Sequence, residues 1–246
     1  MKSTFILVGT LILTLVSQFA SAQAQGAITY ETKMNMHRNI PADRAQMKDM
    51  IPEFRTTRQI LTYNATESLY KPLIDEQDDM AASGNGGGQM VMIRIPQNQT
   101  YINTAQSKRV VLREFMGKNY ITQDSLSILP WKFGSETKTI QGYACKQATY
   151  TDEKSGKTTV AWFTDKLRPN LGPDNFTSLP GAVLEIDFDN GLRVTKATKV
   201  DFKPLKKNDL VEPTKGEKMT DKQYQEMVAE QMKQRGANGG TFMIRN

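Results

Sequence analysis

Strand-like alternation of apolar and polar residues recurs in short segments along most of the chain, and this feature limits the possible folds most. The clearest segment spans residues 183–194. Three apolar residues alternate there with two acids, in the order Leu184, Glu185, Ile186, Asp187 and Phe188. Asn190-Gly191 follows, and because both residues adopt positive φ at low cost, the pair favours a type I′ turn between antiparallel strands. We expect the three apolar side chains to share one buried face and the two carboxylates to face solvent.

Similar patterns predict further strands, separated by turn-forming residues. The predicted segments are 27–36, 56–63, 67–73, 90–95, 100–103, 109–115, 127–133, 138–151, 157–164 and 194–202. Residues 40–52 predict a short helix, and Thr220 with Gln223 forms the capping-box pattern of a C-terminal helix. The expected fold class is therefore mainly β: a curved antiparallel sheet, as an open barrel or as two layers, with a short helix near the N-terminus and a C-terminal helix.

The first 24 residues have the features of a secretory signal peptide. Lys2 precedes an apolar run of about 12 residues, whereas a membrane-spanning helix needs about 20. Small residues at Ala20, Ala22 and Ala24 predict cleavage after Ala22 or Ala24, and no cysteine there could carry a lipid. We therefore expect a periplasmic or secreted protein with no transmembrane segment in the mature chain.

The rest of the chain is expected to form one domain with a tail. Residues 25–205 are assigned to the antiparallel β domain, which includes a flexible loop at residues 75–89 that is rich in glycine and acids. Residues 206–246 are assigned to a Lys-rich linker, a helix and a loose tail. The net charge is +6, but the basic residues are interspersed with acids, so no nucleic-acid partner is expected.

Few residues offer catalytic chemistry. Cys145 is the only cysteine, and it lies in an alternating segment, so we expect it to pack in the core as a small apolar residue. His37 is the only histidine, and no nucleophile or metal-ligand spacing accompanies it. A catalytic mechanism that uses only Asp and Glu side chains is an open alternative, but no residue pattern in the sequence supports it. The sequence thus predicts no enzyme and no cofactor.

Residues 131–180 resemble the GLPGLI family, exported bacterial proteins of uncertain biochemical role. The residues that carry the resemblance are Trp131, Trp162, Gly172, Pro173, Leu179, Pro180 and Gly181. Leu-Pro-Gly is typical of a type II turn, in which Gly181 would have positive φ. We expect the motif to position a loop against the strand on which Trp131 and Trp162 pack, in preference to forming a ligand pocket. The resemblance implies no catalytic residues.

These observations predict an exported, non-enzymatic binding or accessory protein of the cell envelope. Its partner would be an envelope protein or a hydrophobic ligand held by the curved sheet. The alternative is a copper-binding protein, because Met34, Met36 and His37 place two thioethers and an imidazole close together, and thioethers suit Cu(I). Methionine also fills adaptable cores, which is the simpler interpretation.

Overall fold

The computed structural model describes residues 25–73, 97–153 and 155–237. Four predicted features lie outside the described residues, wholly or in part: the signal peptide at 1–24, the Gly-rich loop at 75–89, the strand at 90–95 and the end of the tail.

The strands of the described chain form one twelve-stranded sheet. They are β1 (Gly26–Asn35), β2 (Phe54–Tyr63), β3 (Glu67–Pro72), β4 (Gln99–Asn103), β5 (Lys108–Phe115), β6 (Lys118–Ser125), β7 (Lys132–Ile140), β8 (Tyr143–Thr151), β9 (Thr158–Thr164), β10 (Ala182–Phe188), β11 (Arg193–Asp201) and β12 (Glu217–Met219). Their order across the sheet is β12-β6-β5-β4-β3-β2-β1-β11-β10-β9-β8-β7. All neighbours are antiparallel except β12, which runs parallel to β6. The sheet stays open, with β12 and β7 at its two edges, and the predicted mainly β fold is confirmed.

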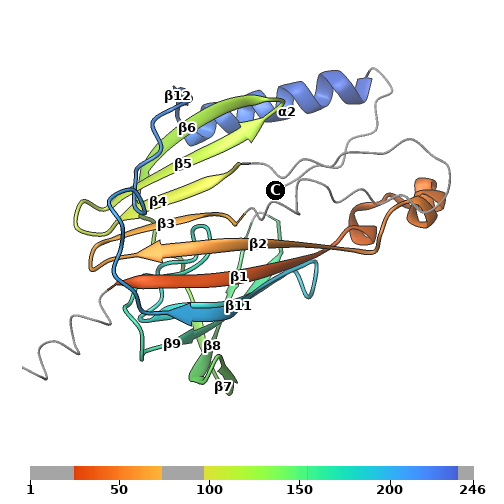
Figure 1. The fold of residues 1–246 in the computed structure, drawn as a ribbon. Helices are drawn as coiled ribbons and strands as arrows, with labels where there is room; N and C mark the ends of the chain where they lie inside the picture. The colour runs from red at the N-terminus through yellow and green to blue at the C-terminus, as the bar shows by residue number, and fades with distance from the viewer. Residues whose placement is uncertain (1–24, 74–96, 154, 238–246) are drawn as a thin grey trace, which may run out of the picture.

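Three helices accompany the sheet in the described chain. They are the 3-10 helices η1 (His37–Asn39) and η2 (Ala42–Met50), and the α-helix α2 (Asp221–Ala237). The helix η2 confirms the helical segment predicted at residues 40–52, whereas η1 lies before it. Figure 1 shows α2 beside β6, toward the edge of the sheet formed by β12. None of the described helices is long and apolar enough to cross a membrane.

The capping box predicted for the C-terminal helix is present. Gln223 N–H donates to Thr220 Oγ1 at 3.1 Å, and Thr220 N–H donates to Gln223 Oε1 at 2.8 Å. These two bonds satisfy backbone donors that a helix start otherwise leaves unpaired. Tyr224 then docks the helix on the sheet, because its ring meets that of Tyr120 edge-on at 5.8 Å and lies 4.8 Å from the Arg113 guanidinium.

The turn between β10 and β11 is longer than predicted. Phe188 pairs with Arg193, so the four residues 189–192 connect the strands in place of a two-residue type I′ turn. Asn190 and Gly191 do adopt positive φ, but so does Asp189. The side chain of Asp187 accepts a hydrogen bond from Gly191 N–H at 2.6 Å, which stabilises the wider loop.

The predicted faces of β10 are also wrong in part. Val183 pairs with Phe163 and Glu185 with Trp162, so Leu184 is an extra residue in a β-bulge. A bulge changes the direction in which the following side chains point. Leu184 and Ile186 accordingly belong to different core clusters, and Glu185 is only 8% exposed instead of facing solvent. The physical reason is that β10 is an interior strand, flanked by β9 and β11, rather than part of a free hairpin.

Three apolar clusters form the core. The first cluster joins β1–β3 to β7–β11: Ile28, Tyr30, Leu61, Tyr63, Tyr70, Ile140, Cys145, Trp162, Leu167, Leu171, Ala182, Leu184 and Ala197. The second is Ala148, Ala161, Phe163, Phe176, Leu179, Val183 and Ile186. The third is Leu69, Tyr101, Val110, Leu112 and Ile121. Cys145 is fully buried in the first cluster, and burial raises the pKa of its thiol to about 11, so the predicted core position is confirmed.

Candidate functional site

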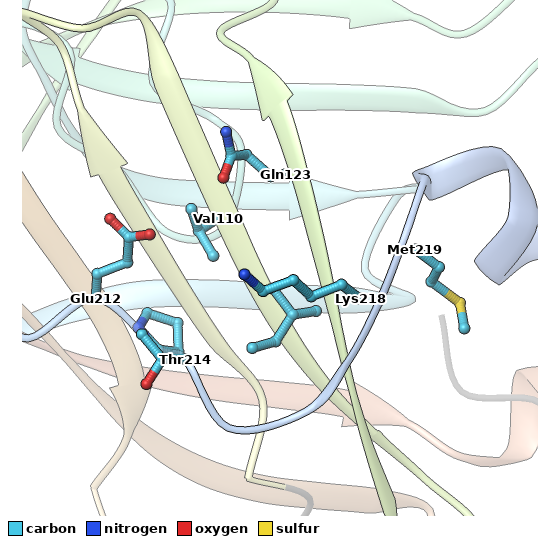
Figure 2. Close-up of a pocket in the computed structure, with 8 residues that line it drawn as sticks. Val110, Gln123, Glu212, Thr214, Lys218 and Met219 are labelled. Atoms are coloured by element: carbon cyan, nitrogen blue, oxygen red, sulfur yellow. The ribbon is translucent and has the colours of Figure 1, made fainter.

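A pocket of about 120 Å³ lies between strands β5 and β6 and the C-terminal part of the chain (Figure 2). Its lining residues are Val110, Ile121, Gln123, Glu212, Pro213, Thr214, Lys218 and Met219. The first three come from the sheet, and the others come from the segment that leads into and includes β12. The pocket therefore exists only when residues far apart in sequence pack together.

The chain after β11 builds one wall of this pocket. Residues 202–216, which we call the strap, lead from β11 in the interior of the sheet to the edge where β12 pairs with β6 (Figure 1). Leu210 of the strap packs against the third core cluster. At Gly216, a Cβ atom would lie 3.0 Å from the Asn119 carbonyl oxygen, so glycine allows the strap to approach β6 closely.

The floor of the pocket is apolar. Val110 and Ile121 are 1% and 5% exposed, and both belong to the third core cluster. Since interior strands hold these side chains, the floor is rigid in comparison with the exposed residues around it. A fixed apolar surface surrounded by polar groups is the usual composition of a small-ligand site.

The rim of the pocket carries four different polar groups: the amide of Gln123, the carboxylate of Glu212, the hydroxyl of Thr214 and the ammonium of Lys218. Lys108 Nζ donates to both carboxylate oxygens of Glu212, at 2.7 and 2.8 Å. Figure 2 shows the Lys218 side chain extending across the pocket, with its ammonium end toward Val110 and Glu212. Together these groups supply both hydrogen-bond donors and acceptors to a ligand on the apolar floor.

The residues of the predicted motif lie elsewhere, in the loop of residues 165–181 between β9 and β10. Leu179 is 1% exposed and packs in the second core cluster. Gly181 does not have the positive φ that a type II turn would require. A Cβ atom at Gly181 would instead lie 2.1 Å from the Thr164 carbonyl oxygen, so close packing accounts for this glycine. Gly172 is similar, because a Cβ there would lie 2.0 Å from the Phe176 carbonyl oxygen.

The two tryptophans pack in different core clusters, and each cluster contains residues of this loop. Trp131 Nε1–H donates to Ser178 Oγ at 3.0 Å, and its ring lies 6.2 Å from that of Phe176. Trp162 belongs to the first core cluster, away from the second cluster that holds Leu179. Pro173 is buried beside Gly172, whereas Pro180 is exposed. The part of the loop that holds Phe176 and Leu179 therefore packs near Trp131, whereas Leu167 and Leu171 of the same loop share the first core cluster with Trp162.

Trp162 also lies within a row of charged side chains that crosses the sheet. Lys138 Nζ is 4.2 Å from the centre of the Trp162 ring and 2.5 Å from Glu185 Oε1, and Lys196 Nζ is 3.7 Å from Glu185 Oε2. Burying a carboxylate costs free energy unless cations compensate for the lost hydration, and these lysines do so from either side of β10. The row explains how Glu185 can be buried.

The methionines and the histidine of the copper hypothesis lie near the end of β1. Met34 is in β1, and Met36 and His37 follow it at the start of η1. His37 Nε2 lies 2.7 Å from the Ile51 carbonyl oxygen, so this nitrogen already has a protein partner. In the part of the chain that the structure describes, no three His, Cys, Asp or Glu side chains are grouped to hold a metal ion. A thioether site is not covered by that finding, and copper binding stays a prediction.

Sequence reasoning missed the pocket because it assigned residues 206–220 to a linker. The lysines there were the available signal, but their density alone is typical of a solvated segment. Lys218 lines the pocket because it pairs with Ile121, and this pairing follows from the position of β12 in the sheet.

Comparison with known proteins places the chain in a family. Residues 75–226 match the family model described as "N-glycanase peptide, N-terminal domain". The match spans more than half of the chain, and the chain therefore belongs to this family. The GLPGLI resemblance is wrong, and the predicted role as an accessory protein of the cell envelope is overturned with it.

Two solved structures of PNGF-II share the fold. The structure in space group C2 is 21% identical over 84% of this chain, with a TM-score of 0.56. The structure in space group P21 is 20% identical over 84% of this chain, with a TM-score of 0.55. In both cases the chain spans 33% of the length of the PNGF-II chain. No curated protein matches this sequence.

Proposed function

We propose that this chain is a glycan-recognition module, and that the pocket beside β12 binds a sugar of an N-linked glycan. The observation that carries the proposal is the pocket itself, with four different polar groups around an apolar floor, in a member of a family named for N-glycanases. The family name connects the chain to N-linked glycans, and the pocket supplies a place for one of their sugars.

The chemistry of the rim fits a sugar. A sugar ring presents several hydroxyl groups, each of which donates and accepts hydrogen bonds, together with apolar C–H faces. Gln123 and Thr214 offer both donors and acceptors, Glu212 offers acceptors, and Val110 with Ile121 offers an apolar surface to the C–H face. This combination supports recognition of a neutral or charged sugar at the end of a glycan.

In this proposal the chain binds glycans without cleaving them, and it does so outside the cytoplasm. No pair of side chains in the pocket forms the nucleophile and base arrangement of a hydrolase. The apolar run and small residues of the first 24 positions support export. The expected outcome is that an N-glycoprotein incubated with the purified chain keeps its glycans, as measured by mass spectrometry.

Isothermal titration of the purified chain with N-glycans tests the proposal. Gln123→Ala removes one amide from the rim, and we expect it to weaken binding about tenfold, which corresponds to about 1.4 kcal/mol. Gln106→Ala is the matched control, because Gln106 is exposed in the turn between β4 and β5 and does not line the pocket. Absence of binding to any N-glycan, or equal losses in the two variants, would overturn the proposal.

A further inference from the structure

The ammonium of Lys218 has no ion-pair partner in the part of the chain that the structure describes. Glu212 is the acid that lines the same pocket, but both of its oxygens accept hydrogen bonds from Lys108, and no ion pair joins it to Lys218. The two charges of that pair cancel each other. Lys218 therefore leaves one uncompensated positive charge at the pocket.

The surroundings of the pocket add to this positive charge. Lys203, Lys206, Lys207 and Lys215 of the strap are exposed, and none forms an ion pair with a described residue. The acids of the strap and β12 are fewer. Asp209 accepts a hydrogen bond from the backbone N–H of Lys206, Glu212 is paired with Lys108, and Glu217 is exposed next to Lys218. On the neighbouring strands, Arg109 and Asp124 form a pair at 3.4 Å and so contribute little net charge. A site with a net positive field attracts anions.

We propose that the pocket selects glycans that end in an acidic sugar, and that Lys218 binds the carboxylate or sulfate of that sugar. The inference rests on the proposed glycan recognition and adds the class of glycan. An ammonium forms a charge-assisted hydrogen bond to an anion, and this bond is stronger next to an apolar floor than in bulk water.

The size of the pocket fits the acidic group at the end of a glycan. A volume of about 120 Å³ is small beside the roughly 300–1,000 Å³ of pockets that enclose a whole small ligand. The pocket therefore accepts the acidic substituent and the adjoining part of one ring, while the rest of the glycan lies along the exposed strap.

Calorimetric titration with a matched set of glycans tests the inference. The probes are a sialylated N-glycan, the same glycan without its sialic acid, and a form that carries sulfate at the terminal sugar. We expect the two acidic glycans to bind at least tenfold more tightly than the neutral one. A difference that appears with only one of the two anions also supports the inference and identifies the acidic group.

Substitutions of Lys218 test whether this residue causes the preference for acidic glycans. Lys218→Gln should remove the preference, so that this variant binds acidic and neutral glycans with similar affinity, and Lys218→Arg should keep the preference. Lys132→Gln is the matched control, since Lys132 is exposed on β7, at the opposite edge of the sheet. Circular dichroism of each variant verifies the fold, which the exposure of Lys218 leads us to expect unchanged.

The outcomes separate the two proposals. Equal affinity of the unaltered protein for acidic and neutral glycans would overturn the acidic preference and leave glycan recognition standing. The same loss of preference in Lys218→Gln and Lys132→Gln would overturn the role of Lys218. A failure to bind all three glycans would overturn the proposed function together with this inference.

Discussion

At Gly181, glycine is required because there is no room for a side chain, and not because the backbone needs a positive φ. The sequence suggested a type II turn, in which glycine supplies positive φ. The structure shows no positive φ at Gly181, but it places the Cβ position 2.1 Å from the Thr164 carbonyl oxygen at the end of β9. Gly191 is the opposite case, because its φ is +84° and a Cβ there would meet no atom within 4 Å.

The two glycines should therefore respond differently to alanine. Gly181→Ala forces the backbone of the loop away from β9, and we expect it to lower the free energy of unfolding by about 3 kcal/mol. Gly191→Ala strains only a left-handed backbone, and we expect a loss of about 1 kcal/mol. Urea denaturation of both variants measures the difference, and equal losses would contradict the packing explanation.

Helix α2 is the element whose attachment depends most on a few side chains. In its described part, no residue is fully buried. Its contacts with the sheet concentrate near its start, where Asp221 pairs with Arg113 at 2.8 Å and Tyr224 packs against Tyr120. Later apolar residues such as Met227 and Val228 are only half-buried. The helix is consequently held at its first turn.

Tyr224→Ala should detach the helix without unfolding the sheet. The variant loses the contact with the Tyr120 ring and the cation–π contact with Arg113, which together stabilise the docked helix by about 1 to 3 kcal/mol. Limited proteolysis should then cut within residues 221–237 faster, while hydrogen exchange of β1 and β2 stays slow. Lys233→Ala, on an exposed position of the same helix, is the control and should behave like the unaltered protein.

Across the whole molecule, β1 connects strands from the two ends of the sequence. It pairs with β2 on one side and with β11 on the other, and Tyr30 donates a hydrogen bond from its hydroxyl group to the Val183 carbonyl oxygen at 2.7 Å. The first core cluster also extends across both parts of the sheet. The sheet is therefore one unit rather than two halves that fold independently.

A single unfolding transition should follow from this arrangement. Trp131 and Trp162 both report on the part of the sheet that contains β8–β10, whereas circular dichroism reports on all strands. Because β1 couples the parts, urea should produce the same midpoint by tryptophan fluorescence and by circular dichroism. Two separate midpoints would contradict the coupling, and Tyr30→Phe should lower the common midpoint without splitting it.

Local patterns were sufficient for much of the fold. Alternation predicted most strands, and Thr220 with Gln223 predicted the start of the C-terminal helix, because each of these signals depends on neighbours in sequence. The burial of Cys145 was also predictable, since a lone cysteine in an alternating segment packs as a small apolar residue. The family could not be derived in this way, and the short motif around Leu179 suggested a wrong one.

The sequence by itself determined most of the strand segments, because that preference arises from local alternation of side chains. It did not predict β6 or β12, and it predicted a strand at residues 127–133 although β7 begins only at Lys132. The tertiary structure alone decided how those segments meet. It buried Glu185 between Lys138 and Lys196, since β10 lies in the interior of the sheet. It also brought Lys218 to the apolar floor of the pocket by pairing β12 with β6, a contact between residues about a hundred positions apart. Such contacts depend on the packing of the entire sheet, and no local pattern specifies them.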